Sequence, residues 1–184
     1  MRFFCVILCC LATLFSAAAA VAPDLVVNDL NGVPRHPLTS TDKAASVLIF
    51  YWQDCPISNG YAPELNRIAA THTNFAFYIV QVDAGLSATA ARQHARQYDL
   101  HIPVLLDPQH RLVKLAKATV TPEAVVFSKN GQVLYRGRID DLYPAFGKKR
   151  AAAQRHDLAD ALDAIAAGQP VKPMETEAIG CFIQ

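Results

Sequence analysis

The sequence predicts a three-layer α/β domain with a mixed central sheet, preceded by a small N-terminal hairpin. Apolar runs alternate with helix-like segments between residues 46 and 106, and strands separated by helices pair in parallel through right-handed crossovers. Two later strands are joined by Asn130-Gly131, a turn that adds them to the sheet as an antiparallel hairpin. About 160 residues follow the N-terminal apolar segment, which is enough for one domain with its own core.

The N-terminal half supplies the parallel strands and the helices between them. Asn31-Gly32 is a strong turn signal inside the first hairpin. A continuous apolar run without alternation then predicts a strand buried on both faces. Pro63 should kink the next helix, and Ser87 is placed to cap the helix after it. The expected elements are a hairpin over Leu25–Leu38, strands over Ser46–Tyr51 and Phe75–Val82, and helices over Pro56–Ala70 and Ser87–Tyr98.

The C-terminal half closes the sheet and covers it. Gly168 stands where a residue of positive φ ends a helix, and Pro170 and Pro173 predict an irregular tail beyond it. The expected elements are a strand over Pro103–Leu106, a helix over Arg111–Ala118, strands over Glu123–Ser128 and Gln132–Arg138, and a helix over His156–Ala167.

The first 20 residues have the pattern of a secretory signal peptide. Arg2 is followed by an apolar core, and Ala18 to Ala20 form a small-residue exit. An uncleaved anchor is the alternative, but the apolar core is short for a span of about 20 residues. We therefore expect cleavage after Ala20, a secreted or periplasmic protein, and no membrane span in the mature chain.

Composition narrows the remaining function classes. Three of the five cysteines lie in the N-terminal segment, which leaves Cys55 and Cys181 to pair or to react in an oxidising compartment. The net charge of +1 gives no basic stripe, so nucleic acid is not expected as a partner. The six histidines lack ligand spacing. The leading interpretation therefore includes no cofactor and no metal.

Cys55 is the strongest candidate for chemistry. A buried strand ends just before Asp54-Cys55-Pro56, and Pro56 suits the first position of a helix. The N–H groups at a helix start favour the thiolate, which is the reactive form of cysteine, whereas the Asp54 carboxylate opposes it. The net direction of the pKa shift stays open at this point, and a small apolar cysteine packed at a strand end is the plainer alternative.

Three features together resemble a thioredoxin-fold redoxin over residues 24–168. Trp52 and then Cys55 follow the buried strand, Pro63 lies eight residues after Cys55, and Thr121-Pro122 precedes a later strand. The resemblance implies a cis peptide bond before Pro122. It also implies that this loop faces Cys55 and presents its backbone to an extended partner chain. Residues 169–184 form a tail that carries Cys181.

The subgroup that the chain resembles is the uncharacterised peroxiredoxin-like group, related to alkyl hydroperoxide reductase and thiol-specific antioxidant proteins. The matching segments are Cys55-Pro56-Ile57-Ser58, residues 134–141 and Gly180–Ile183. Ser58 stands where thioredoxins have their second cysteine. Trp52 and Leu48 stand where peroxiredoxins have a hydroxyl residue and a proline. We therefore expect reaction with peroxide to be slow and the partner thiol to come from Cys181.

Several residues are expected to support the chemistry of Cys55. The candidates for substrate binding or thiolate support are Trp52, Pro56, Ser58 and Arg138. For Arg138, a salt bridge to Asp140 or Asp141 is the plainer interpretation. For Cys181, the leading interpretation is a disulfide with Cys55. An intermolecular disulfide and a role as a metal ligand are the alternatives. Because the tail has little structure of its own, we expect oxidation to order it and reduction to release it.

The sequence thus predicts an exported thiol-based oxidoreductase. The Cys55 thiolate would attack a protein disulfide or a hydroperoxide, and Cys181 or an external thiol reductant would resolve the product. The alternative is a protein that binds or delivers copper through Cys55 and Cys181, since thiolates are soft ligands for Cu(I).

Overall fold

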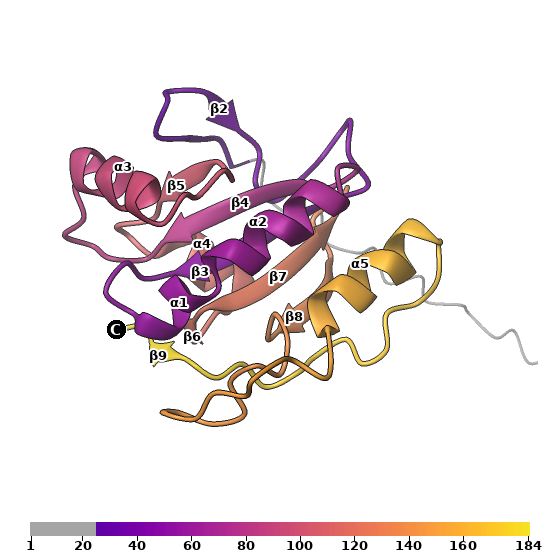
Figure 1. The fold of residues 1–184 in the computed structure, drawn as a ribbon. Helices are drawn as coiled ribbons and strands as arrows, with labels where there is room; N and C mark the ends of the chain where they lie inside the picture. Colours follow the sequence, from indigo (N-terminus) through magenta and orange to yellow (C-terminus); the bar gives the residue numbers. More distant parts are fainter. Residues whose placement is uncertain (1–24) are drawn as a thin grey trace, which may run out of the picture.

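The computed structural model describes residues 25–184, and its centre is a five-stranded mixed sheet (Figure 1). The strand order is β5-β4-β3-β7-β8, in which β3, β4 and β5 are parallel and β7 and β8 antiparallel. The strands are β3 (Ala45–Tyr51), β4 (Ala76–Gln81), β5 (Val104–Leu106), β7 (Glu123–Ser128) and β8 (Val133–Gly137). This arrangement confirms the predicted fold class. The expected signal peptide lies outside the described residues.

Helices cover both faces of the sheet and complete three layers. The helices are α1 (Pro56–Gly60), α2 (Ala62–Thr71), α3 (Ala88–Gln97), α4 (Arg111–Ala116) and α5 (Asp157–Ala166). Helices α2 and α5 pack on one face and α4 on the other, where residues before β3 also contribute. Among the described residues, no helix has the length and apolarity that crossing a membrane requires.

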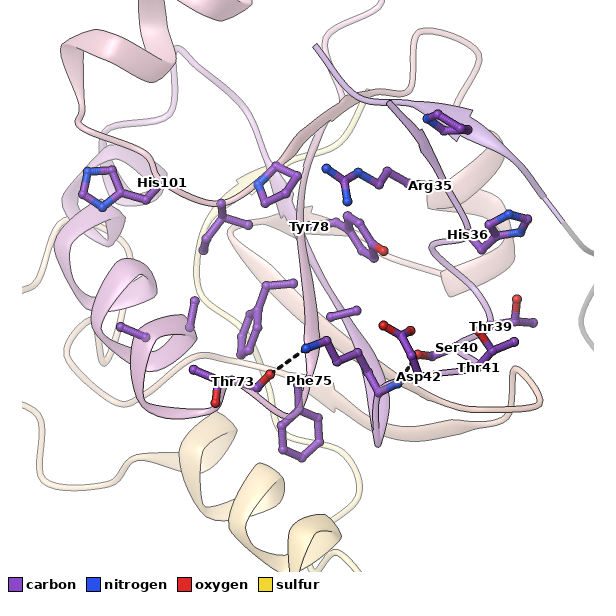
Figure 2. Close-up of a pocket in the computed structure, with 18 of the residues that line it drawn as sticks. Arg35, His36, Thr39, Ser40, Thr41, Asp42, Thr73, Phe75, Tyr78 and His101 are labelled. Carbon is purple, nitrogen blue, oxygen red and sulfur yellow. Dashed lines mark hydrogen bonds between the residues drawn. The ribbon is translucent and has the colours of Figure 1, made fainter. Parts of the chain in front are cut away.

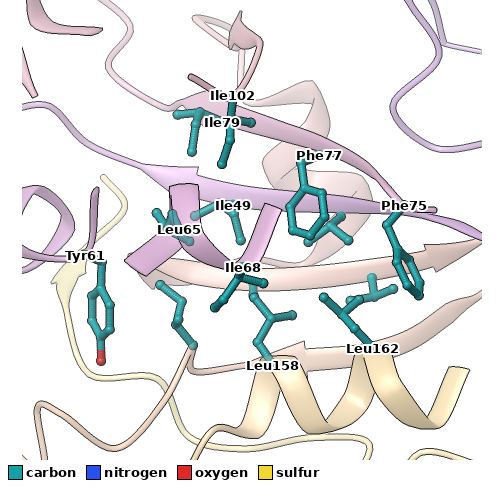
Figure 3. Close-up of a cluster of buried hydrophobic side chains, with 14 of the residues drawn as sticks. Ile49, Tyr61, Leu65, Ile68, Phe75, Phe77, Ile79, Ile102, Leu158 and Leu162 are labelled. Carbon is teal, nitrogen blue, oxygen red and sulfur yellow. The ribbon is translucent and has the colours of Figure 1, made fainter. Parts of the chain in front are cut away.

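Strand β3 is the axis of the core because every one of its residues is buried. Successive side chains of a strand point to opposite faces, so Val47 and Ile49 join one apolar cluster and Leu48 and Phe50 the other. Figure 3 shows the first cluster, in which side chains of α2 and α5 meet those of the strands: Leu65, Ile68, Leu158 and Leu162 with Ile49, Phe77 and Ile79.

Turn and helix signals of the sequence are found where they were expected. The first hairpin pairs β1 (Val27–Asn28) with β2 (Pro34–Arg35), and Gly32 has a φ of 79°. Pro63 does more than kink its helix. The helix is interrupted at Tyr61, and Pro63 lies in the first turn of the new helix α2, where a proline needs no N–H partner.

The C-terminal tail differs from the expected irregular segment. A two-residue strand, β9 (Cys181–Phe182), pairs antiparallel with β6 (Val120–Thr121). Further upstream, Arg136 of β8 donates its backbone N–H to Met174 and accepts one from Thr176. In Figure 1 the yellow tail returns from α5 along the β8 edge and ends beside α1. Both cysteines are free thiols in this state, so docking of the tail requires no disulfide.

Candidate active site

Cys55 lies where β3 gives way to α1. It is the N-cap of α1, with Pro56 in the first turn and extended backbone angles of −85° and 112°. Its backbone N–H bonds to the Trp52 carbonyl at 3.0 Å and closes the turn. The side chain has no exposed surface. The short turn after the buried strand therefore holds the sulfur rigidly inside the protein.

The sulfur faces the loop that precedes β7. Cys55 Sγ lies 3.2 Å from the Thr121 carbonyl oxygen, and the Thr121–Pro122 peptide bond is cis. The buried Glu123 carboxylate accepts hydrogen bonds from the N–H groups of Thr119 and Val120, at 2.8 and 3.4 Å. These bonds fix the loop, and with it the carbonyl that contacts Cys55.

The tail brings the second thiol to the same place. In the β6–β9 pair, Cys181 is opposite Thr121. The Cys181 side chain lies close enough to Cys55 for each thiol to shift the pKa of the other. Cys181 is partly exposed, whereas Cys55 is fully buried. Cys55, Cys181, Thr121 and Pro122, four candidates from different parts of the sequence, are therefore neighbours in the structure.

Burial and hydrogen bonding give the two thiols opposite pKa shifts. Burial raises the pKa of Cys55, but hydrogen bonds from Cys181 and Ser58 outweigh it and the net pKa is lowered. Burial, together with the nearby Cys55 sulfur, raises the pKa of Cys181 to about 12. The two shifts run in opposite directions, so Cys55 loses its proton before Cys181 does and is the better nucleophile of the pair. Asp54 is not among the groups that set the balance at Cys55.

This arrangement gives a direct expectation for two substitutions. Cys181→Ala removes the stronger hydrogen bond to the Cys55 sulfur, so it should raise the pKa of Cys55 more than Ser58→Ala does. The ultraviolet absorbance of the thiolate, followed as a function of pH, measures both shifts. Equal midpoints in the parent protein and in Cys181→Ala would contradict the arrangement.

The remaining candidates have distinct positions. Ser58, at the place of the missing second cysteine, is fully buried beside Cys55. Trp52 packs against both apolar clusters and lines a small cavity of about 190 Å³ together with Phe182 and Ile183. Pro56 starts α1 and is exposed. These three residues surround Cys55.

Arg138 is placed differently from both interpretations drawn from the sequence. Its guanidinium donates to the Asp157 carboxylate at 2.7 and 3.2 Å, and not to Asp140 or Asp141. Arg138 is also not among the groups that shift the pKa of Cys55. Its observed contacts fix α5 to the end of β8.

Two features of the site gave little signal in the sequence. At Gly180 the chain passes so close to the loop that an added Cβ would lie 2.0 Å from the Thr121 carbonyl oxygen. Behind Cys55, the Asn59 side-chain oxygen is shared by Tyr51 Oη and His94 Nε2, each at 2.9 Å. This shared contact joins β3, α1 and α3. Gly180 precedes Cys181 in the sequence, but its close contact with Thr121 depends on the pairing of two segments that are far apart along the chain.

Another cavity, of about 870 Å³, is shown in Figure 2, and neither Cys55 nor Cys181 is among the residues that line it. It is lined by residues before β3 and at the starts of β4 and β5, among them Lys43, Phe75 and Pro103. Cys55 follows the carboxyl end of β3, which is the edge where ligands of parallel sheets are usually bound. Size alone therefore does not identify the site.

Another cluster of metal-ligating type is separate from the thiols. Glu64, Asp140 and His156 have ligand atoms within 4.8 Å of one another. Both Glu64 oxygens are already bound by Arg67, and Asp140 accepts from Tyr61 and from the Leu142 N–H. These groups have protein partners, so the cluster is not a strong candidate for a metal site.

Comparison with known proteins decides the family. The family model described as AhpC/TSA matches residues 18–136, which is more than half of the chain. The chain belongs to the AhpC/TSA family. This confirms the resemblance to thioredoxin-fold redoxins that the sequence predicts. Curated relatives named thiol-disulfide oxidoreductase ResA come from Bacillus thuringiensis, at 25% identity over 114 residues, and from Geobacillus kaustophilus, at 24% over 117 residues.

These matches are partial in length. The first covers 61% of this chain and 65% of the relative, and the second 64% and 67%. The chain therefore spans about two thirds of the length of the curated relatives that it matches.

Solved structures show that the AhpC/TSA chain shares its fold with proteins of similar size. An uncharacterised conserved protein from Geobacillus kaustophilus has a TM-score of 0.76 at 24% identity and covers 90% of each chain. A hypothetical protein from Sinorhizobium meliloti has a TM-score of 0.69 at 23% identity, with 89% and 91% coverage. A secreted disulfide oxidoreductase of Mycobacterium tuberculosis has a TM-score of 0.56 at 21% identity, with 77% and 96% coverage.

Proposed function

We propose that this protein is a thiol–disulfide oxidoreductase that works through Cys55 and Cys181. The observation that supports this best is the convergence of the only two cysteines among residues 25–184 at the cis Thr121–Pro122 loop, with opposite pKa shifts. A lowered pKa provides a nucleophile, and a neighbouring protonated thiol provides its resolving partner. The relatives named thiol-disulfide oxidoreductases support the same reaction class.

In the first step, the Cys55 thiolate attacks one sulfur of a partner protein's disulfide. A bond forms between Cys55 Sγ and that sulfur, and the partner's second sulfur leaves as a thiolate. The negative charge has then moved from Cys55 to the partner. Cys55 no longer acts as the charged neighbour that helps to raise the pKa of Cys181. Formation of the mixed disulfide therefore makes deprotonation of Cys181 easier.

In the second step, Cys181 gives up its proton and its sulfur attacks Cys55 Sγ. The partner's first sulfur leaves as a thiolate, so the partner has gained two electrons and the protein holds a Cys55–Cys181 disulfide. An external thiol reductant restores both thiols by supplying two electrons. The proposal needs no cofactor or metal.

We also propose that Cys55 reacts, more slowly, with hydroperoxides. The same thiolate would be oxidised to a sulfenic acid as the O–O bond breaks, and Cys181 would then form the disulfide with loss of water. Trp52 occupies the place of the pocket hydroxyl of peroxiredoxins, so we expect a rate constant with hydrogen peroxide far below about 10⁷ M⁻¹s⁻¹. Stopped-flow measurement that gives such a value would identify a dedicated peroxidase instead.

We also propose that the protein acts outside the cytoplasm, as a secreted or periplasmic enzyme. The signal-like pattern of the first 20 residues supports this location, and so does the similarity in fold to a secreted disulfide oxidoreductase. Copper binding is the second candidate function. The contact between the Cys55 and Cys181 thiols favours it, because two thiolates offer a soft two-ligand site for Cu(I).

Intact mass separates these functions in one experiment. The reduced protein is incubated with insulin as the disulfide substrate, quenched and alkylated. We expect neither Cys55 nor Cys181 to take up the alkylating group after reaction, whereas both do so before it. Free thiols after exposure to the substrate would contradict the oxidoreductase, and a mass increase equal to one copper ion in the purified protein would favour the alternative.

A further inference from the structure

In the docked state, neither cysteine is ready to meet a partner protein. The Cys55 side chain has no exposed surface, so the thiol of lowered pKa is out of reach. Cys181 is partly exposed and lines a groove of about 760 Å³, but the pKa of this thiol is raised to about 12. The accessible thiol is therefore protonated, and the reactive one is covered. When the tail lifts, Cys55 becomes accessible and loses the hydrogen bond from Cys181, and the hydrogen bonds from Ser58 are those that still lower its pKa.

Residues Gly180 to Ile183 form the cover, and they lie on the loop as a strand would. Their pairing places Cys181 opposite Thr121. The Ile183 N–H continues it with a bond of 3.0 Å to the Thr119 carbonyl. Gly180 approaches so closely that any Cβ would clash with the Thr121 carbonyl. The tail thus occupies the backbone edge beside Cys55 that an extended partner chain would need.

The cover is joined to the domain by a segment that makes no hydrogen bonds with other described residues and that only the apolar packing of Ile179 holds against the first apolar cluster. Thr176 is firmly anchored, because its hydroxyl contacts Tyr135 Oη at 2.7 Å and the Arg138 N–H at 3.1 Å. Between this anchor and Gly180, residues 177–179 make none of the hydrogen bonds found among the described residues. Residues after Thr176 therefore have a natural hinge, and the cover can lift without loss of the anchor.

We propose that Gly180–Ile183 is an internal substitute for the partner strand, which must lift from β6 before Cys55 reacts, and that the partner segment resembles it chemically. This inference rests on the proposed oxidoreductase function. The partner is an extended polypeptide whose disulfide-bonded cysteine follows a glycine and has an aliphatic residue two positions after it. Added strands gain affinity from main-chain bonds and specificity from the contacts of alternate side chains.

Each position of the tail specifies one feature of that partner. Only glycine fits the close approach at position 180. The side chain after the cysteine is free to vary in size, because Phe182 is 78% exposed. The next position favours an aliphatic residue, since Ile183 is half-buried against the second apolar cluster beside Trp52.

The first test measures whether the tail covers Cys55. In a Cys181→Ser background, Gly180→Ala introduces a Cβ that disrupts the pairing with β6. We expect alkylation of Cys55, located by peptide mapping at a pH above the usual pKa of a thiol, to become at least about tenfold faster as the open population grows. Gly85→Ala in the same background is the matched control. An added Cβ there meets only Asp83 Oδ1 at 3.5 Å, so the rate should stay that of the background.

A second variant guards against a folding defect. Truncation after Ile179 removes the cover and leaves the Thr176 anchor, and thermal melting shows whether the domain remains intact. The truncation should speed up alkylation of Cys55 at least as much as Gly180→Ala does. Equal rates in the background, Gly180→Ala and the truncated protein would overturn the proposal.

The second test measures the chemistry of the partner. Peptides Gly-Cys-Phe-Ile-Gln and Ala-Cys-Phe-Ile-Gln, each linked by a disulfide to thionitrobenzoate, are offered to the truncated protein. The Cys55 thiolate forms a disulfide with the peptide sulfur and releases coloured thionitrobenzoate. We expect the glycine peptide to react about tenfold faster, a preference of about 1.4 kcal/mol. Equal rates would overturn the proposed partner chemistry. Failure of Cys55 to react even with a small symmetrical disulfide would instead overturn the oxidoreductase function and this proposal with it.

Discussion

Replacing Cys55 with serine is expected to reduce disulfide exchange to the rate of a blank without protein. The attacking species is a thiolate, and a serine hydroxyl does not ionise near neutral pH. Cys181 is not expected to take over the attack, because burial raises its pKa even without the contribution of Cys55. Turbidity of insulin during reduction by a small thiol measures the effect. Activity in Cys55→Ser would end the assignment of the nucleophile.

Cys181→Ser separates the nucleophile from the resolving thiol. Cys55 can still attack in this variant, but the mixed disulfide with the partner then has no internal thiol to resolve it. We expect a protein–partner adduct that persists on a non-reducing gel and disappears with excess dithiothreitol. Rapid turnover without an adduct would show that an external thiol resolves the intermediate and that Cys181 has another role. The same gel with Cys55→Ser should show no adduct.

The sequence predicted most of the fold because the main signals are local. The unbroken apolar run of β3 requires burial on both faces, and Asn31-Gly32 and Asn130-Gly131 specify tight hairpin turns. Pro63 marked the interruption between α1 and α2. Each of these features depends on neighbouring residues, so it can be recognised without knowledge of the tertiary structure.

The short pairing of β6 with β9 depends on residues far apart in the sequence. Two-residue strands have no periodicity, and the tail contains prolines that favour irregular structure. The backbone N–H and C=O groups along the free edge of β6 stabilise β9, and this edge exists only after the loop at Thr121 has folded. For the same reason, the hydrogen bond from Cys181 that lowers the pKa of Cys55 had no counterpart in the sequence, where the helix start and Asp54 were the visible influences.

Arg138 shows how side-chain partners escape sequence reasoning even when the strand is correct. Period-two alternation placed Arg136 and Arg138 on one face, and nearby aspartates offered partners. In the structure, α5 brings Asp157 to the end of β8 instead. The Asp157 side chain is only 4% exposed and accepts hydrogen bonds from Arg138 and from Arg155. Asp157 lies in the first turn of α5, where the helix dipole also favours a carboxylate.

Arg138→Met should therefore destabilise the domain without changing the nucleophile. It leaves the buried Asp157 carboxylate with Arg155 alone, and loss of one partner from a buried pair costs about 3–5 kcal/mol. Because the Arg138 side chain is 25% exposed, water replaces part of the lost interaction, and we expect a decrease of about 2 kcal/mol in the free energy of unfolding. For a domain of this size, that corresponds to a melting temperature lower by about 4–8 °C.

Arg136→Met, two residues earlier on the same strand, is the matched control for this substitution. Its ion-pair partner Glu175 is 71% exposed, and such pairs contribute about 0–1 kcal/mol. Arg136 also favours the charged form of the buried Glu123, so we expect a smaller decrease in melting temperature than in Arg138→Met, not an absent one. The pH midpoint of the Cys55 thiolate in folded Arg138→Met distinguishes a structural arginine from one that supports the thiolate. An unchanged midpoint with a lower melting temperature fits the observed pairing with Asp157. A raised midpoint would restore Arg138 to the active site, because only an arginine that acts on Cys55 shifts its pKa when it is removed.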